Sequence, residues 1–185
     1  MVSPVQSLWV GSELSELEIL SIKSFQKLGH KFILYTYEDV KGIPPKTIIK
    51  DGNKIMKKKD LFQFKSSFLP FSDLFRYKML YENGGYWVDL DMIALKPLKF
   101  KETFIFSSER TIQKGPYRNR TKTEIENIGI LKAPKKSAFY KELFEACLEE
   151  SKKEVKENIQ FMRTISKWTF LYCSLRRENK CFLKF

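Results

Sequence analysis

The segment from Ser72 to Asp91 constrains the fold more than any other, because a helix, a glycine turn and a buried strand follow one another there without a linker. Apolar residues recur at helical spacing after Ser72, which is a suitable N-cap, and Asn83-Gly84-Gly85 ends the helix. The apolar run Tyr86–Val88 follows at once and leads into Asp89-Leu90-Asp91. Such close alternation is typical of an α/β fold, in which helices pack against a mostly parallel sheet.

The beginning of the chain shows the same alternation. Val5–Val10 is an apolar strand candidate, a helical pattern runs from Leu14 to Leu28, and Lys31–Tyr37 is a second strand candidate. A strand, a helix and a strand joined by short turns form a βαβ unit, whose two strands are parallel. The pattern therefore predicts a parallel pair at the start of the sheet.

The whole chain divides into one domain, residues 1–150, and a C-terminal helical segment, residues 151–185, that completes or extends it. Residues 51–71 are basic and aromatic without a clear period, which predicts irregular turns or short helices. The last helix is expected around Ile159–Leu175. The other expected elements are the strands Thr47–Ile49, Thr103–Ser107 and Asn127–Lys132 and the amphipathic helix Lys135–Glu150.

Composition narrows the class of protein. Lysine and arginine outnumber aspartate and glutamate by 34 to 22, and the net charge of +12 favours anionic partners without choosing among them. Three cysteines without CxxC spacing and a single histidine, His30, argue against a zinc or disulfide framework and favour reduced thiols, so we expect a cytoplasmic protein. No apolar run approaches the ~20 residues that span a bilayer, so we expect no transmembrane segment and leave contact with a membrane surface open.

Three suggestive segments each follow an expected parallel strand: Trp9-Val10-Gly11, Tyr35-Thr36-Tyr37 and Asp89-Leu90-Asp91. In open α/β sheets the ligand binds beyond the carboxyl ends of the strands, so these segments should share one edge. Two carboxylates two residues apart suit a divalent cation with oxygen ligands. We interpret Asp89 and Asp91 as metal residues, and the candidate nucleotide-binding side chains are Trp9, Val10, Tyr35 and Thr36.

Asp73 and Arg76 lie three residues apart on the expected helix. This spacing fits an intrahelical ion pair, but it also fits an arginine that holds phosphate or sugar hydroxyls beside an aspartate that accepts from sugar hydroxyls. Trp9 is either a core anchor or a surface on which a nucleobase stacks. Neither a Walker A loop nor a G-x-G-x-x-G sequence is present, so phosphate would be held by a metal and by side chains. The pattern predicts a metal-bridged pyrophosphate and a nucleotide-sugar enzyme.

The motif Ser72-Asp73-x-x-Arg76-Tyr77, continued by Gly84-Gly85-Tyr86-Trp87-x-Asp89-x-Asp91, resembles the DXD sugar-binding region of family 32-type glycosyltransferases. These include capsular-polysaccharide transferases and, more distantly, the glucosylating clostridial toxins. The segments Ser7–Gly11 and Ile128–Pro134 also look like strands of that family. The resemblance covers roughly residues 5–148. It implies a GT-A-like, Rossmann-like α/β fold, a nucleoside diphosphate sugar donor and Mn²⁺ or Mg²⁺.

The resemblance also implies roles for individual residues. Asp89 and Asp91 would anchor the metal and the ribose, Asp73 and Arg76 would hold the donor sugar and the phosphates, and Trp9 would hold the base. Many family members place a third metal ligand near the C-terminus beside Gly-Pro or His. Nothing after Leu148 offers either sequence, and this sets the chain apart from that pattern.

We therefore expect a metal-dependent glycosyltransferase that moves a sugar, with a UDP-sugar favoured as donor, to a hydroxyl of a glycan or protein-linked glycan. Asp91 and Arg76 are the expected catalytic residues, because negative charge builds on the leaving diphosphate. Glu109, after the Thr103–Ser107 strand, is the candidate base if the reaction inverts. The resemblance suggests a retaining reaction, which would need no such base, and the sequence leaves both courses open.

Two other interpretations are weighed against the transferase. The first is an idle domain that binds a nucleotide sugar and a metal without transfer or hydrolysis. The second is a basic nucleic-acid-binding module, supported by the net charge and by Phe62, Phe64 and Phe68 among lysines. A nucleic-acid module would have no use for Asp89 and Asp91, whose carboxylates repel phosphate in the absence of a metal.

Overall fold

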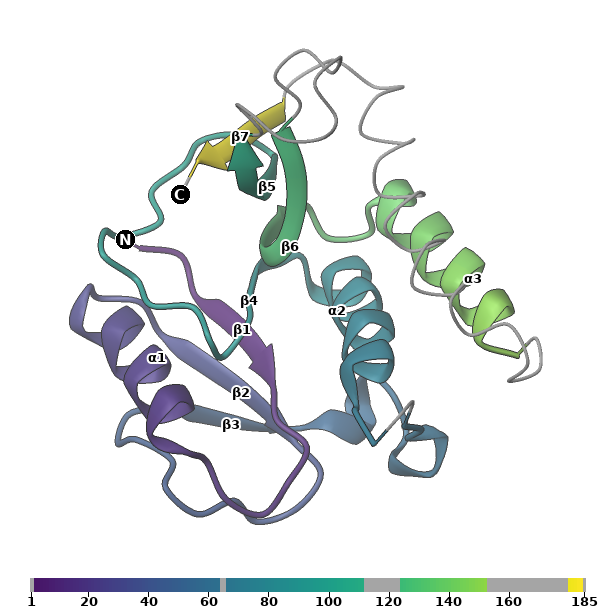
Figure 1. Ribbon diagram of the computed structural model, residues 1–185, viewed down its shortest axis with the longest axis horizontal. Coiled ribbons are helices and arrows are strands. Elements are labelled where there is room, and N and C mark those ends of the chain that lie inside the picture. Colours follow the sequence, from purple (N-terminus) through teal and green to yellow (C-terminus); the bar gives the residue numbers. More distant parts are fainter. Residues whose placement is uncertain (1, 64–65, 112–123, 153–179, 185) are drawn as a thin grey trace.

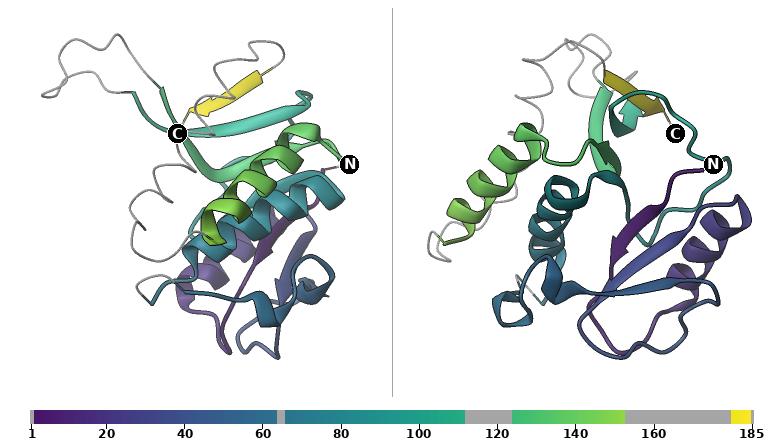
Figure 2. Two further views of the ribbon diagram at one scale, coloured as in Figure 1. Left: turned by 90° about the vertical axis from the view of Figure 1, so that its right-hand side faces the viewer. Right: turned by 180° about the vertical axis from the view of Figure 1, so that it is seen from behind.

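The structure is a computed structural model that describes residues 2–63, 66–111, 124–152 and 180–184. Within these residues seven strands form one sheet in the order β3-β2-β1-β4-β6-β5-β7, with helices against both of its faces (Figures 1 and 2). The strands are β1 Val5–Leu8, β2 Phe32–Thr36, β3 Ile48–Asp51, β4 Gly85–Val88, β5 Phe104–Thr111, β6 Glu124–Ala133 and β7 Lys180–Lys184. The helices are α1 Glu16–Lys27, α2 Leu69–Asn83 and α3 Ala138–Lys152, with short 3₁₀ turns at Gly52–Lys54 and Lys58–Asp60.

Most neighbouring strands are parallel. β1 pairs in parallel with β2 and β4, β2 pairs in parallel with β3, and β7 runs parallel to β5. β6 lies antiparallel between β4 and β5. The expected α/β class with a mostly parallel sheet, and the parallel βαβ unit at its start, are confirmed.

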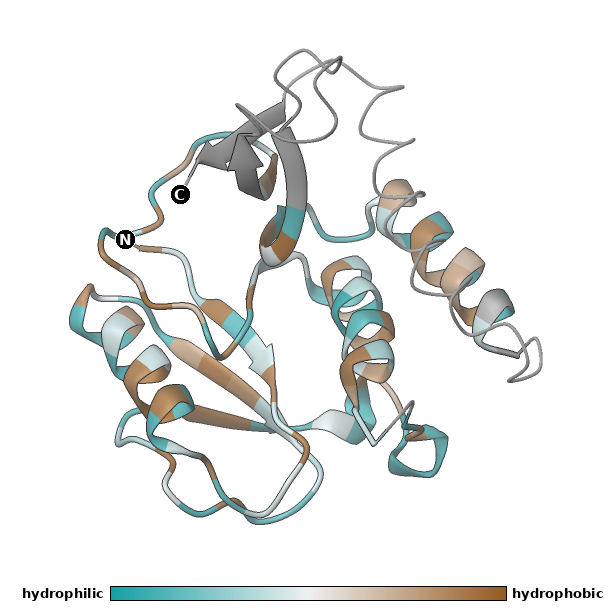
Figure 3. Ribbon diagram, viewed as in Figure 1, coloured by the Kyte–Doolittle hydropathy of each residue, from teal (hydrophilic) through white to brown (hydrophobic). Residues whose placement is uncertain are grey.

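The sheet separates two apolar layers, and β2 shows how its sequence divides between them. Phe32 and Leu34 pack with α1, whereas Ile33 and Tyr35 pack in the layer that contains α2 and α3. Successive strand residues point to opposite faces, so a continuous apolar strand is buried on both sides. Figure 3 shows apolar residues along β2 and α1. Because both faces are covered, ligands reach the sheet at its edges.

α2 begins earlier than the sequence indicates. Ser72 was expected as the N-cap, but the helix starts at Leu69, and Ser72 lies in its first turn. Pro70 occupies the first turn, where its missing N–H costs no hydrogen bond, and Ser67 Oγ accepts from Leu69 N at 3.2 Å. The prediction of Ser72 as the start is therefore wrong.

The glycine end of α2 is confirmed. Gly84 has φ of 65°, a conformation that costs little only for glycine, and its N–H donates to Leu80 O. A Cβ built on Gly84 would lie 2.9 Å from the Cα of Lys135. The turn therefore brings α2 directly into β4 and close to the segment that follows β6.

The end of the chain differs from the helical segment expected over residues 151–185. α3 continues to Lys152, and residues 180–184 form β7. Residues 153–179, where a helix was expected at 159–175, lie outside the described residues. β5 is paired on one side with β6, and its other side gives the backbone of β7 a parallel partner. A helix is therefore the wrong prediction for residues 180–184. No helix in the described ranges is long and apolar enough to cross a membrane.

Candidate functional site

The three segments singled out in the sequence lie at one edge of the sheet. β1, β2 and β4 are parallel, so the residues that follow them come to the same side. Trp9 N donates to Tyr35 O at 2.9 Å and joins the first two segments. From β1 the sheet grows through β2 and β3 in one direction and through β4 in the other. A crevice is expected where the strand order reverses in this way, which is between Trp9 and Asp89.

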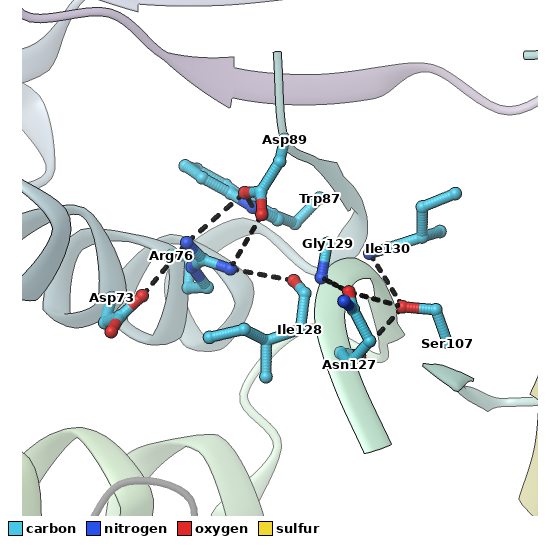
Figure 4. Close-up of polar contacts among 9 residues, drawn as sticks. All are labelled: Asp73, Arg76, Trp87, Asp89, Ser107, Asn127, Ile128, Gly129 and Ile130. Carbon is cyan, nitrogen blue, oxygen red and sulfur yellow. Dashed lines mark hydrogen bonds and ion pairs between the residues drawn. The ribbon is translucent and has the colours of Figure 1, made fainter. Parts of the chain in front are cut away.

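Asp89 is held from several sides, as Figure 4 shows. Its Oδ1 accepts a 2.7 Å hydrogen bond from Trp87 Nε1 and lies 3.2 Å from Arg76 Nη2. Its backbone N donates to Gly129 O at 2.8 Å. The side chain of Asp89 is 28% exposed, and Asp91 is exposed. One carboxylate of the Asp-x-Asp pair is thus fixed by the protein, while the other is open to solvent.

Arg76 joins Asp89 to Asp73. The guanidinium is 3.0 Å from Asp73 Oδ1, donates to Ile128 O at 2.8 Å and lies over the ring of Trp87. The side chains of Arg76 and Asp73 are 2% and 3% exposed. The ion pair that the i, i+3 spacing allows is therefore present, and it extends to Asp89. Because Arg76 is buried and Asp89 is partly exposed, Arg76 would influence a group bound at this edge through Asp89.

Burial sets the protonation behaviour of this cluster. It raises the pKa of Asp73 to about 6, although Arg76 opposes the shift. Burial also raises the pKa of Asp89, and here Arg76 and the hydrogen bond from Trp87 act in the opposite direction. For Arg76, burial works to lower the pKa, but Asp89 and Asp73 outweigh it and raise the pKa. The arginine therefore stays charged and is the fixed positive centre of the cluster.

The expected nucleotide-binding residues separate into two groups. Trp9 and Val10 are half-buried at the edge, and the buried Nε1 of Trp9 makes no hydrogen bond within the described part of the chain. Tyr35 and Thr36 are 1% and 6% exposed. The hydroxyl of Tyr35 donates to Gln6 Oε1 at 3.2 Å and accepts from Asn83 Nδ2 at 2.7 Å. The structure thus places Trp9 and Val10 at the surface of the edge and the side chains of Tyr35 and Thr36 beneath it.

The sequence suggested that Glu109 follows a strand, but in the structure it lies inside one. β5 continues to Thr111, and Glu109 lies inside it at a register shift between Ser108 and Arg110. The strand is longer than expected because β6 and β7 pair along both of its sides. The side chain of Glu109 is outside the described part of the structure, so its role as a base remains a prediction.

Residues that the sequence did not single out also build this edge. β5 residues Phe106 and Ser107 pair with Leu131 and Asn127, so residues 128–130 of β6 have no partner on β5. Ser107 Oγ donates to Asn127 O at 2.8 Å and accepts from Ile130 N at 3.1 Å. Two signals were present: Trp87 and Asp89 share a strand face at i, i+2, and Asn127-x-Gly129 has the spacing of an Asx turn.

The residues present fit a divalent cation with oxygen ligands. Asp89 and Asp91 supply two carboxylates, and no group of three or more potential ligands occurs within residues 2–63, 66–111, 124–152 and 180–184. Mg²⁺ and related cations are commonly bound by one or two carboxylates together with substrate phosphates and water. The edge therefore suits an ion that arrives with a phosphate-bearing ligand.

Comparisons with known proteins agree with this geometry. A family model described as "Glycosyltransferase sugar-binding region containing DXD motif" matches residues 15–112, which include α1, α2, β4 and the Asp-x-Asp pair. Among solved structures, the chain is similar to "PaToxG Glycosyltransferase", with a TM-score of 0.61 and 14% identity over 92% of this chain and 68% of that chain. At that identity the likeness shows the fold alone. No curated protein matches the chain.

Proposed function

Because this chain belongs to the glycosyltransferase family defined by the DXD sugar-binding region, we propose that it transfers a sugar from a nucleoside diphosphate sugar to an acceptor hydroxyl with the help of a divalent metal. The donor we favour is a UDP-sugar, and the acceptor is a glycan or protein-linked glycan. The observation that carries the proposal is the pair of carboxylates after β4, one fixed by Arg76 and Trp87 and one open to solvent.

Asp89 and Asp91 would hold Mn²⁺ or Mg²⁺. When bound, the ion supplies a Lewis acid that stabilises the charge on the leaving diphosphate. Arg76 keeps the carboxylate of Asp89 in one orientation and, as a buried cation, adds positive potential at the same edge. Trp9 offers a half-buried ring at the end of β1, on which a base would stack with about 1–3 kcal/mol of stabilisation, by analogy with single-strand base platforms.

Of the two roles open to Asp73, the ion pair with Arg76 is the one present without a ligand. Its side chain is 3% exposed and paired with Arg76, so in this arrangement it supports the arginine. We propose that it reaches donor hydroxyls only if donor binding opens the edge. Glu109, whose backbone lies in β5, is the candidate base for an inverting reaction. A retaining reaction would leave it without that role.

The first experiment is isothermal titration of UDP and GDP, each with Mn²⁺ and with EDTA. Asp91→Ala should weaken manganese-dependent binding at least about tenfold, because loss of residues that merely support metal ligands already costs 10–100-fold. Asp60→Ala is the matched control, since Asp60 is an exposed aspartate in the 3₁₀ turn Lys58–Asp60.

Binding of one nucleotide that needs Mn²⁺ and is lost only in Asp91→Ala supports the donor site. Donor hydrolysis and transfer assays then separate an active transferase from an idle binding domain. If the folded wild-type protein binds neither nucleotide, the proposed function is wrong, and salt-dependent binding of nucleic acid becomes the next measurement.

A further inference from the structure

β6 leaves register with β5 beside the proposed metal site. Residues 128–130 have no partner on β5, yet on the other side of β6 Ile130 still pairs with Val88 of β4. The extra residues therefore bulge on the β5 side while the ladder to β4 continues. Bulges of this kind commonly re-aim groups near functional sites.

The bulged residues turn two carbonyls toward the metal-side cluster. Ile128 O accepts from Arg76 Nη1 at 2.8 Å (Figure 4). Gly129 O accepts from the backbone N of Asp89 at 2.8 Å. One carbonyl thus fixes the arginine that holds the carboxylate of Asp89, and the next carbonyl fixes the backbone of Asp89 itself. Both the side chain and the main chain of Asp89 depend on the shape of the bulge.

Asn127 closes the bulge. Its Oδ1 accepts from Gly129 N at 2.6 Å and lies 3.3 Å from Ser107 Oγ. Because the backbone N–H of Gly129 can only donate, the atom that faces it must be the amide oxygen. A Cβ built on Gly129 would lie 2.7 Å from that oxygen, so the closed turn requires glycine. Ser107, which is fully buried, accepts from Ile130 N and completes the closure.

We propose that Asn127 is a positioning residue for the DXD site. Among the residues that the structure describes, it makes no hydrogen bond to either carboxylate of the Asp-x-Asp pair, and it acts by holding the bulge whose carbonyls fix Arg76 and Asp89. The inference rests on the proposed function for its metal, but the hold on Asp89 is a property of the protein without ligands. The two parts can therefore be measured separately.

The first measurement is amide hydrogen exchange by NMR on the full chain without ligands. In Asn127→Ala the amide of Asp89 should exchange at least about tenfold faster, since its acceptor is no longer held in place. The amide of Trp9, which donates to Tyr35 O at the same edge, should be unchanged and reports on global destabilisation. Asn127→Asp keeps an oxygen acceptor for Gly129 N and should restore the protection of Asp89.

The second measurement is the affinity of Mn²⁺ in the presence of UDP or GDP, whichever the wild type binds. Asn127→Ala and Gly129→Ala should weaken it about 10–100-fold, as for other residues that orient metal ligands, while Asn127→Asp should stay near wild type. Asn53→Ala is the matched control, because Asn53 Oδ1 likewise accepts a backbone N–H, from Lys58 at 2.8 Å, outside this cluster.

Each outcome decides a part of the inference. Unchanged exchange of Asp89 in Asn127→Ala, or equal acceleration at Trp9, would overturn the hold on Asp89. Faster exchange of Asp89 with wild-type manganese affinity would reduce Asn127 to a structural residue. A wild-type protein that binds no manganese–nucleotide complex contradicts the proposed function and the metal part of this inference, while the exchange result still decides the hold on Asp89.

Discussion

At the scale of single residues, Arg76 organises the site. It is an almost fully buried cation with carboxylates on two sides and a carbonyl on a third. Removing one member of such a buried pair is costly, about 3–5 kcal/mol, because it leaves the remaining charge without compensation. Arg76 should therefore be unusually intolerant of substitution, for reasons of stability as well as of function.

Trp87→Phe tests how far the orientation of Asp89 matters. Phenylalanine keeps an aromatic ring against Phe75 and beneath Arg76 but removes the Nε1 donor to Asp89. We expect the free energy of unfolding to fall by about 1.5–3 kcal/mol, because a hydrogen bond to a charged group is lost. We also expect manganese-dependent nucleotide binding to weaken about tenfold. Titrations with Mn²⁺ and with EDTA measure this effect. Equal loss of binding in both would show that Trp87 serves the nucleotide and not the metal.

The residues of the site could be predicted from the sequence only in part. Asp73 and Arg76 could be paired because helical spacing is local, and Asp89 and Asp91 could be placed because they follow a strand. That the side chains of both Asp73 and Arg76 are buried depends on the packing of α2, which is not local. The hold of Asn127 on the bulge depends on the register of β5 against β6, which no short pattern encodes.

At the scale of elements, His30 fastens two segments to the turn before β2. Its Nδ1–H donates to Ser3 O at 2.7 Å, and its Nε2 accepts from Leu98 N at 3.0 Å. A carbonyl can only accept and a backbone N–H can only donate, so both bonds require the neutral ring. His30 is also buried, with 3% of its surface exposed.

Stability should consequently fall below neutral pH through His30. Burial lowers the pKa of His30 from its ordinary 6.5, so below that pH the unfolded chain binds a proton that the folded chain does not. The contribution of His30 to the free energy of unfolding should then decrease as pH falls, by at most about 1.4 kcal/mol per pH unit until its folded pKa is reached, whereas Asp73, whose pKa is raised to about 6, contributes in the opposite direction. Urea unfolding of the wild type and of His30→Gln between pH 7.5 and about 5.5 measures this contribution. The wild type should lose more stability than the variant as pH falls over this range. An equal slope in both proteins would contradict the assignment.

The elements predicted best are those whose pattern is local. β1, α1, β2 and β4 are found where strong periodicity and glycine turns placed them. The start of α2 was misplaced because Pro70 and Ser67 together begin a helix before Ser72. β7 could not be foreseen, since its strand conformation depends on pairing with β5, far away in the sequence.

At the scale of the whole molecule, the proposed donor edge belongs to a chain with a net charge of +12. Such a charge raises the rate at which anionic ligands arrive, and salt screens it beyond about 10 Å at 0.1 M. We expect the association rate of a nucleoside diphosphate to fall severalfold when salt rises from about 50 to 500 mM. Stopped-flow measurements should show no such fall for the uncharged nucleoside. Equal salt dependence for both would mean that the overall charge does not steer the donor.

Arg76 also bears on the order in which the molecule is assembled. Its guanidinium lies between the carboxylates of Asp73 and Asp89 and balances part of their charge from within the chain. Many small metal-binding domains become ordered only when the ion is taken up. This chain carries its own counter-charge, so the edge can be complete before an ion or nucleotide reaches it. If the proposed metal binds here, its uptake follows folding, and a shortage of metal would leave the protein folded but without its ion.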